Sequence, residues 1–177
     1  MMEYYSVTTC LQPFFPAGIP RHLLDRASER GTIVHAACSN YATGIPVMGL
    51  RDDLWGYFQS FVTWFDNFVD EVLFVEQRMV DEAMRYNGKP DLGCKLIDGR
   101  HMIVDMKTPI AEANTWKLQI AGYVNLARIA YPDIEWAGGM SLRLKPNGSA
   151  AKATVYSNDQ RDYAVFLSAL NVYRYIT

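Results

Sequence analysis

Two aspartates and a lysine stand at positions that suit metal-assisted chemistry. Asp91 precedes a predicted β-hairpin, and Asp105 and Lys107 lie beyond its turn, separated by Met106. Because side chains alternate across a β-strand, Asp105 and Lys107 share one face of the strand whereas Met106 points to the other. The pattern therefore predicts a carboxylate and an ammonium group held side by side.

Whether Asp91 joins this pair depends on the turn of the hairpin, around Gly99. A two-residue loop would pair Leu92 with Asp105 and send Asp91 to the opposite face of the sheet. A three-residue loop over residues 97–99, with Gly99 in the left-handed conformation of a bulge, places Asp91 directly opposite Asp105. We expect the three-residue loop.

Two carboxylates directly across neighbouring strands repel each other. A cation between Asp91 and Asp105 would remove this cost, and an all-oxygen ligand set favours Mg²⁺ or Mn²⁺. A D-x-K triplet alone is more often an exposed strand edge than a site. Two carboxylates among apolar neighbours on adjacent strands are harder to explain by stability, because burying an unpaired charge is costly.

Together with two further motifs, these residues resemble the PD-(D/E)xK nuclease superfamily, in particular its RecB-type and phage exonuclease-like subgroup. Pro90–Asp91 and Asp105–Lys107 match the elements that name the superfamily. Gly31–His35 resembles the upstream G-x-x-x-H motif, and Gln119–Tyr123 resembles the Q-x-x-x-Y motif of the helix that follows. The four motifs appear in the order typical of the subgroup.

The resemblance implies a role for each residue of the core motif. Asp91 and Asp105 would ligate Mg²⁺ or Mn²⁺, and the backbone carbonyl of Met106 could complete the coordination shell. His35 would add an imidazole ligand or organise the attacking water. Lys107 would position or activate that water and offset negative charge at the phosphorus.

Three further positions are implied by the same resemblance. Gln119 and Tyr123 lie four residues apart, hence on one helix face, from which both could reach a phosphate or Lys107. Glu76, in an apolar strand before the hairpin, falls where many members of the superfamily have an acidic metal ligand, although this match is weaker. One metal ion or two would support phosphodiester hydrolysis by polarising the phosphate and supporting the leaving oxygen.

Hydrophobic spacing and turn residues predict the elements that position these motifs. We expect helices over residues 20–34, 52–72 and 114–131, strands over residues 73–80, 90–97, 101–106, 136–144 and 151–156, and a last helix from about Asn158. His35 would lie near the end of the first helix, and Asn114 would cap the third. The segment before Pro20, which contains Pro13 and Pro16, is predicted to be irregular.

Each amphipathic helix needs an apolar sheet face to cover, which predicts a central mixed β-sheet flanked by helices. This α/β (α+β) architecture agrees with the restriction-endonuclease-like core that the resemblance implies. The length of 177 residues suits one domain over residues 1–177.

The net charge limits how this protein could bind nucleic acid. The formal net charge of −2 argues against a broad basic surface, so nucleic acid would have to be held in a local groove. Basic residues that could line such a groove are Lys89, Lys95, Lys117, Arg128 and Arg143.

The three cysteines are widely spaced and include no C-x-x-C pair, which predicts reduced thiols rather than a zinc site or disulfides. No cysteine follows Cys94, which makes this chain unlike the RecB-type branches that bind an iron-sulfur cluster.

The expected location is the cytoplasm of a bacterium, as a bacterial or phage-encoded protein without membrane contact. The sequence starts without the basic and apolar run of a signal peptide, and it lacks an apolar stretch long enough for a membrane span. It also lacks a P-loop motif, so a motor or recombination protein would be a separate partner, alongside DNA and a homo-oligomer.

The resemblance favours a DNA exonuclease acting in recombination, repair or phage DNA processing, with exonuclease chosen over endonuclease by family analogy alone. One alternative is a nuclease fold kept as a catalytically weak nucleic-acid-binding or assembly module. Another is a structural or host-takeover protein with an accidental D-x-K triplet, for which His35, Asp91 and Asp105 would lie far apart.

Overall fold

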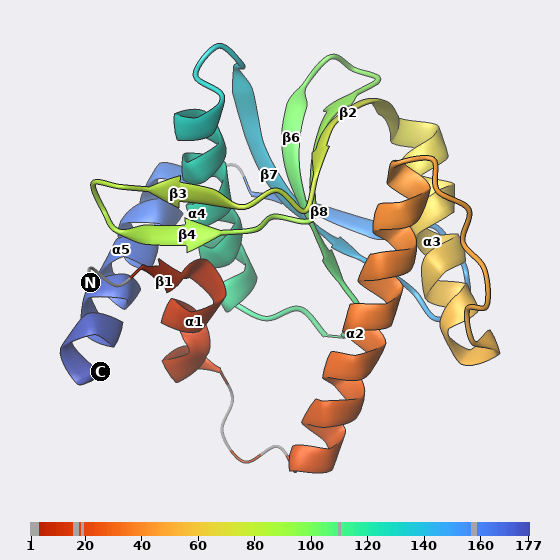
Figure 1. Cartoon of the computed structure of the whole chain (residues 1–177), viewed down its shortest axis with the longest axis horizontal. Coiled ribbons are helices and arrows are strands. Elements are labelled where there is room, and N and C mark those ends of the chain that lie inside the picture. The colour runs from red at the N-terminus through yellow and green to blue at the C-terminus, as the bar shows by residue number, and fades with distance from the viewer. Residues whose placement is uncertain (1–3, 16–17, 19, 110, 157–158) are drawn as a thin grey trace.

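The computed structural model describes residues 4–15, 18, 20–109, 111–156 and 159–177. At its centre is a five-stranded mixed sheet with the strand order β2-β5-β6-β7-β8 (Figure 1). The strands are β2 (Val69–Val75), β5 (Leu92–Leu96), β6 (His101–Lys107), β7 (Trp136–Arg143) and β8 (Lys152–Tyr156). β6 and β7 are parallel, whereas the other neighbouring pairs are antiparallel.

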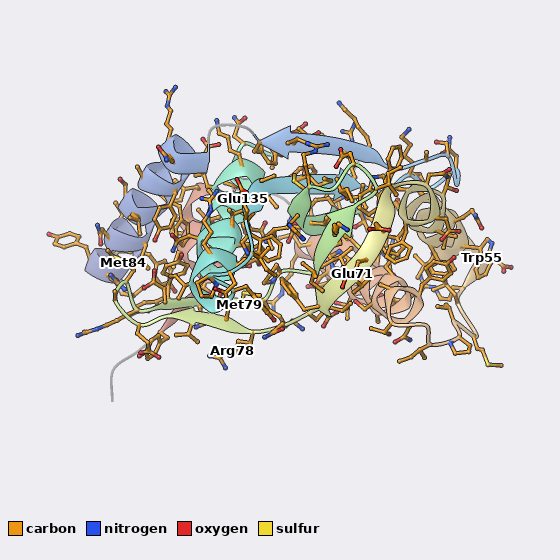
Figure 2. All side chains as sticks on the ribbon, turned by 90° about the horizontal axis from the view of Figure 1, so that it is seen from above. Trp55, Glu71, Arg78, Met79, Met84 and Glu135 are labelled. Carbon is orange, nitrogen blue, oxygen red and sulfur yellow. The ribbon has the colours of Figure 1, made fainter. Side chains whose placement is uncertain are left out.

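Helices cover both faces of this sheet. They are α2 (Arg21–Ala42), α3 (Asp52–Phe68), α4 (Thr115–Ala130) and α5 (Asp159–Ile176). α2 and α3 lie on one side of the strands, and α4 and α5 lie on the other (Figure 1). Seen from above, Trp55 of α3 and Met84 mark opposite ends of the molecule, with the sheet between them (Figure 2). The predicted mixed sheet flanked by helices is confirmed.

The N-terminal segment is more regular than the sequence predicted. It contains the short strand β1 (Tyr5–Ser6), helix α1 (Val7–Leu11) and the 3-10 helix η1 (Gln12–Phe14), while Pro16 lies outside the described residues. β1 joins a second, three-stranded sheet with β4 (Tyr86–Gly88) and β3 (Met79–Asp81). Strands this short leave no periodic pattern, and β1 forms only through pairing with a distant part of the chain.

α2 is longer than predicted. It continues beyond His35 to Ala42 and ends before Gly44, which adopts a positive φ of 76°. The residues after His35 are all compatible with a helix. The helix ends where Gly44 adopts the left-handed conformation that is common just after a helix C-terminus. As a result, His35 lies inside the helix rather than near its end, and Ser39 lies one turn beyond it on the same side.

α3 is shorter than predicted, since the chain passes directly into β2 at Val69. Val69 and Val72 are spaced by three, which suited a helical stripe, but their β-branched side chains also suit a strand, and pairing with β5 decides between the two. The strand predicted over residues 73–80 is likewise divided between β2 and β3. Glu76 lies between these strands rather than within one.

The ends of the last two helices also differ in detail. Asn114 precedes α4 as predicted, but its backbone is already helical and its side chain makes no capping hydrogen bond. Asn158, where the last helix was predicted to begin, lies outside the described residues. No helix in the described part of the chain is long and apolar enough to cross a lipid bilayer.

The β5–β6 hairpin has the predicted register. Cys94 pairs with Met102, and the Leu96 N–H donates to the Arg100 carbonyl at 2.8 Å, which leaves a three-residue loop. Gly99 adopts a φ of 87°, the left-handed conformation that this loop requires. Continuing the register by one pair beyond Leu92 brings Asp91 opposite Asp105.

Candidate active site

The two aspartates of the hairpin approach each other at the end of the sheet that faces α2. Asp105 lies on β6 with a side chain that is 5% exposed, and Asp91 lies directly before β5 with a side chain that is 12% exposed. Asp91 Oδ2 accepts a hydrogen bond from the Met106 N–H at 2.6 Å. This bond fixes the Asp91 carboxylate against the strand that bears Asp105.

α2 adds an imidazole to the aspartates. His35 Nδ1 lies 3.2 Å from Asp91 Oδ1, and the His35 side chain is 26% exposed. Gly31, one turn earlier, faces Thr108 directly after β6, since a Cβ atom built on it would lie 4.0 Å from Thr108 Oγ1. Ser39, one turn later, donates to Glu76 Oε1 at 3.0 Å. One stripe of α2 therefore faces the site, and His35 and Ser39 on it contact acidic groups.

Lys107 is positioned by three different groups. Its Nζ donates to Gln119 Oε1 at 2.7 Å and forms an ion pair with Asp105. The same Nζ lies over the Trp116 ring, 5.6 Å from the ring centroid, which is a cation–π arrangement. With a side chain only 15% exposed, this lysine is held in one place rather than extended into solvent.

Gln119 and Tyr123 connect α4 to the charged groups. Gln119 Nε2 donates to Asp105 Oδ1 at 3.3 Å and to the Tyr123 hydroxyl at 3.1 Å. The Tyr123 hydroxyl also lies 3.4 Å from Thr8 Oγ1 of α1. A Cβ atom on Gly88 would lie 2.7 Å from the Tyr123 ring, so only glycine allows the ring to pack against β4. The six predicted residues from α2, the hairpin and α4 thus form one connected site.

Glu76 lies at the margin of the site and not in a strand as predicted. It adopts a φ of 48°, which is uncommon for a residue other than glycine, and its N–H donates to the Asp91 carbonyl at 3.0 Å. Its Oε2 accepts from Lys89 Nζ at 2.6 Å. The hydrogen bond from Lys89 lowers the pKa of Glu76 and outweighs the effect of its partial burial.

The protonation of the site reflects burial and close charges. Burial opposes protonation of His35, but the attraction and hydrogen bond of Asp91 outweigh it, so the pKa of His35 is raised. Burial raises the pKa of Asp105, and the nearby Lys107 ammonium only partly offsets this. Burial likewise raises the pKa of Tyr123, which keeps its hydroxyl neutral and able to donate a hydrogen bond. Several neighbouring groups with shifted pKa values are typical of functional sites.

The donor set suits a hard divalent cation by type, since it combines two carboxylates with an imidazole. Asp105 Oδ2 is buried and faces the Lys107 ammonium in an ion pair, but without hydrogen-bond geometry to any described residue, so this oxygen keeps acceptor capacity. Within the described residues, however, no three His, Cys, Asp or Glu side chains converge as an assembled metal centre. His35 faces Asp91, whereas Asp105 faces Lys107 and Gln119.

A groove of about 790 Å³ lies elsewhere, between η1, β8, α4 and α5, and none of the site residues lines it. Its lining includes Phe14, Lys117 and Tyr156. The Tyr156 hydroxyl lies 2.9 Å from Ser141 Oγ on β7 and donates to Glu112 at 2.9 Å. The size of this groove does not make it the catalytic site, because the carboxylates, imidazole and lysine that contact one another do not line it.

Sequence reasoning missed several supporting residues. Trp116, Ser39 and Thr8 contact the site from three helices, and Lys89, proposed for phosphate binding, instead pairs with Glu76. Helical spacing could have placed Trp116 and Ser39, which stand three and four residues from Gln119 and His35. No local signal placed Thr8, since its helix meets α4 only in the folded chain.

Comparison with known proteins shows that this chain shares its fold with a solved structure. No protein-family model and no curated protein sequence matches the chain. Among solved structures, the chain is similar to a crystal structure from Eubacterium rectale named "Putative exonuclease", with a TM-score of 0.59 and 12% sequence identity. The match covers 99% of this chain and 83% of that one. At this identity the likeness shows that the two chains share a fold.

Proposed function

We propose that this protein is a metal-dependent nuclease of the PD-(D/E)xK superfamily that hydrolyses phosphodiester bonds in DNA, as an exonuclease. The single observation that supports this most strongly is the convergence of Asp91, Asp105 and Lys107 on one sheet face, with His35 and Gln119 against them. The name of the similar Eubacterium rectale protein is compatible with this activity.

Asp91 and Asp105 would hold Mg²⁺ or Mn²⁺, with His35, the Met106 carbonyl and Glu76 as further ligands. When bound, the metal would polarise the scissile phosphate and support charge on the oxygens that attack and leave. Recombination, repair and phage DNA processing are the settings that the resemblance suggests.

The chain's own residues supply positioning and charge. The Lys107 ammonium, held by Gln119 and Trp116, would face the phosphate and offset the negative charge that develops as water attacks phosphorus and the ester bond breaks. Gln119 accepts from Lys107 and donates to Asp105, so it orients both groups. Tyr123, as a second acceptor from the Gln119 amide, fixes which way that amide points.

A second candidate is a nuclease fold that binds nucleic acid or assembles with a partner but cuts poorly. The observation in its favour is that Asp105 is already engaged by Lys107 and Gln119, without an assembled three-ligand centre among the described residues. The alternative of an accidental D-x-K triplet required the imidazole and carboxylates to lie far apart, and the contact of His35 with Asp91 argues against it.

A cleavage assay distinguishes these candidates. Linear and circular DNA, single- and double-stranded, is incubated with Mg²⁺ or Mn²⁺ and with an EDTA control. We expect metal-dependent cutting of linear DNA that is lost in Asp105→Ala and Lys107→Ala but kept in Asp98→Ala and Lys95→Ala. The control residues have the same charges but form ion pairs outside the site. Cutting that survives the first two substitutions would refute the assignment of the site.

Metal binding is tested separately by calorimetry with Mn²⁺. Asp91→Ala should weaken Mn²⁺ binding, because it removes a carboxylate from the proposed ligand set. Asp98→Ala, at the hairpin turn, should bind Mn²⁺ like the wild type. An unchanged affinity in Asp91→Ala would remove that residue from the ligand set.

A further inference from the structure

Three basic residues lie side by side across three neighbouring strands. Lys107 on β6 pairs in register with Arg143 on β7, and Arg143 pairs in register with Lys152 on β8. Residues opposite each other in register share a sheet face, so all three side chains project toward the face that bears Asp105 and α4. We call Lys107, Arg143 and Lys152 the basic row.

The basic row brings like charges together on neighbouring strands. Like charges directly across strands destabilise a sheet. The whole chain has a net charge of −2, yet the segment 136–156, which contains β7 and β8, has three basic residues and no Asp or Glu. Within the described part of the chain, Lys152 has no acidic partner and is exposed. Positive charge is therefore concentrated on this hairpin although the protein is acidic.

The row begins inside the candidate site and ends at the edge of the sheet. Lys107 and Arg143 are half-buried on neighbouring strands, and Lys152 is exposed on the edge strand β8. Two steps of about 4.8 Å between strands give a row roughly 10 Å long. One strand of DNA advances about 3.4 Å per phosphate along the helix axis, so a row of this length spans about three such steps.

We infer that the basic row binds the phosphate backbone of the nucleic-acid strand that is cut, with Arg143 and Lys152 each contacting a phosphate on one side of the scissile bond. This rests on the proposed nuclease function and adds a direction to it: the strand runs from Lys107 across β7 to the β8 edge. Phosphate contacts fix register without reading bases, so the row confers no sequence preference.

A simpler reading treats Lys152 as edge protection, because lysine on an edge strand discourages pairing with another chain. That reading accounts for Lys152 alone. It leaves unexplained why the opposing residue on the inner strand β7 is an arginine, and why the row ends at the lysine of the D-x-K motif.

The test measures binding of a fluorescent DNA oligonucleotide of about 20 nucleotides in EDTA, so that no cutting occurs, from about 50 to 200 mM KCl. Arg143→Gln and Lys152→Gln should each weaken binding about 3- to 10-fold and lower the slope of log K against log salt by about 0.7 to 0.9. Lys95 was predicted to line the groove, but it forms an ion pair with Asp70 and lies opposite His101, at the other end of β6 from Lys107. Lys95→Gln, which lowers the net charge by the same amount, is therefore the matched control. Arg143→Lys should keep the slope of the wild type.

Hydrolysis with Mg²⁺ gives a second measurement. Lys152→Gln should raise KM and leave kcat close to the wild-type value, because it removes binding and not chemistry. If the wild type cuts DNA but neither Gln variant changes the salt slope more than Lys95→Gln, the basic row is refuted while the nuclease function stands. If the wild type neither binds nor cuts DNA, both proposals fail. Should Arg143→Gln fail to fold by circular dichroism, the exposed Lys152→Gln decides alone.

Discussion

Alternate residues of β6 face two very different environments. Val104 and Met106 point toward α2 and α3 and lie in a cluster of apolar side chains. Asp105 and Lys107 point toward α4, where polar groups interrupt a second apolar cluster that contains Ile103. The two faces are one residue apart in sequence, yet one is packed as an ordinary core and the other holds charges in hydrogen-bonded positions.

The helices on each side account for this difference. α3 presents Phe58, Phe61 and Trp64 to the sheet, and these side chains stabilise only by burial and ring contacts. α4 presents Gln119 and Tyr123, whose amide and hydroxyl groups satisfy the charged residues of β6. Burying charges on the α4 side lowers the free energy of unfolding. Apolar packing on the α3 side raises it and so offsets this cost.

The largest expected effect on the hydrolysis rate comes from substituting one of two neighbouring residues on β6. Lys107→Met should lower the hydrolysis rate by about 10²- to 10⁴-fold, because a positioned charged group is removed from the reacting atoms. Met106→Leu changes only the side chain on the opposite face and keeps the backbone carbonyl and N–H at the site. It should therefore retain the rate and cost less than about 1.5 kcal/mol of stability. Single-turnover cutting and thermal unfolding of both variants test the pair. Equal rate losses would mean that the two faces do not differ as described.

Phe61→Ala tests the other side of the comparison. This fully buried ring lies in the α3 cluster, and its removal should lower the free energy of unfolding by about 3–5 kcal/mol through lost burial and a cavity. Urea unfolding measures the loss, with the half-exposed Trp55→Ala as a control that should cost much less. Cutting per folded molecule should be unchanged. A rate loss beyond the folded fraction would show that the α3 side contributes directly to the chemistry.

Two glycines near the site should respond in opposite directions. Gly88→Ala forces a methyl group against the Tyr123 ring and should cost about 1–3 kcal/mol while also lowering the rate of cutting. Gly31→Ala, inside α2 with space for a methyl group, should stabilise by about 0.5–1 kcal/mol. Thermal unfolding and cutting assays on both variants measure this. Destabilisation by Gly31→Ala would mean that the α2 stripe is more tightly packed than the distances indicate.

The smallest expected effect concerns the thiols, which are buried on both sides of the sheet. Burial raises the pKa of Cys10 to about 11 and that of Cys94 to about 12, and raises that of Cys38 as well. Because the thiolate is the reactive form, a raised pKa lowers reactivity at a given pH. Alkylation of the folded protein at about pH 8.5 should therefore be far slower than in guanidinium, and should increase as pH rises toward 11. A thiol that reacts equally fast in both states would lie on a looser surface than the structure shows.

Local relations along the chain could be predicted from the amino-acid sequence. The alternation of Asp105, Met106 and Lys107 follows from backbone geometry over a few residues. The spacing of Gln119 and Tyr123 placed them on one helix face for the same reason. These are short-range relations that no distant contact alters. The glycine in the hairpin turn allowed two loop lengths, and the structure has the expected three-residue loop, which brings Asp91 opposite Asp105.

Contacts between distant residues could be seen only in the folded chain. The change from α3 to β2 at Val69 and the pairing of β1 with β4 both depend on neighbours far along the chain. The alignment of Arg143 and Lys152 with Lys107 depends on β7 lying parallel to β6. No pattern in the sequence near these residues predicts that pairing. Long-range pairing is selected by the summed packing of whole elements, so it emerges only when those elements are assembled.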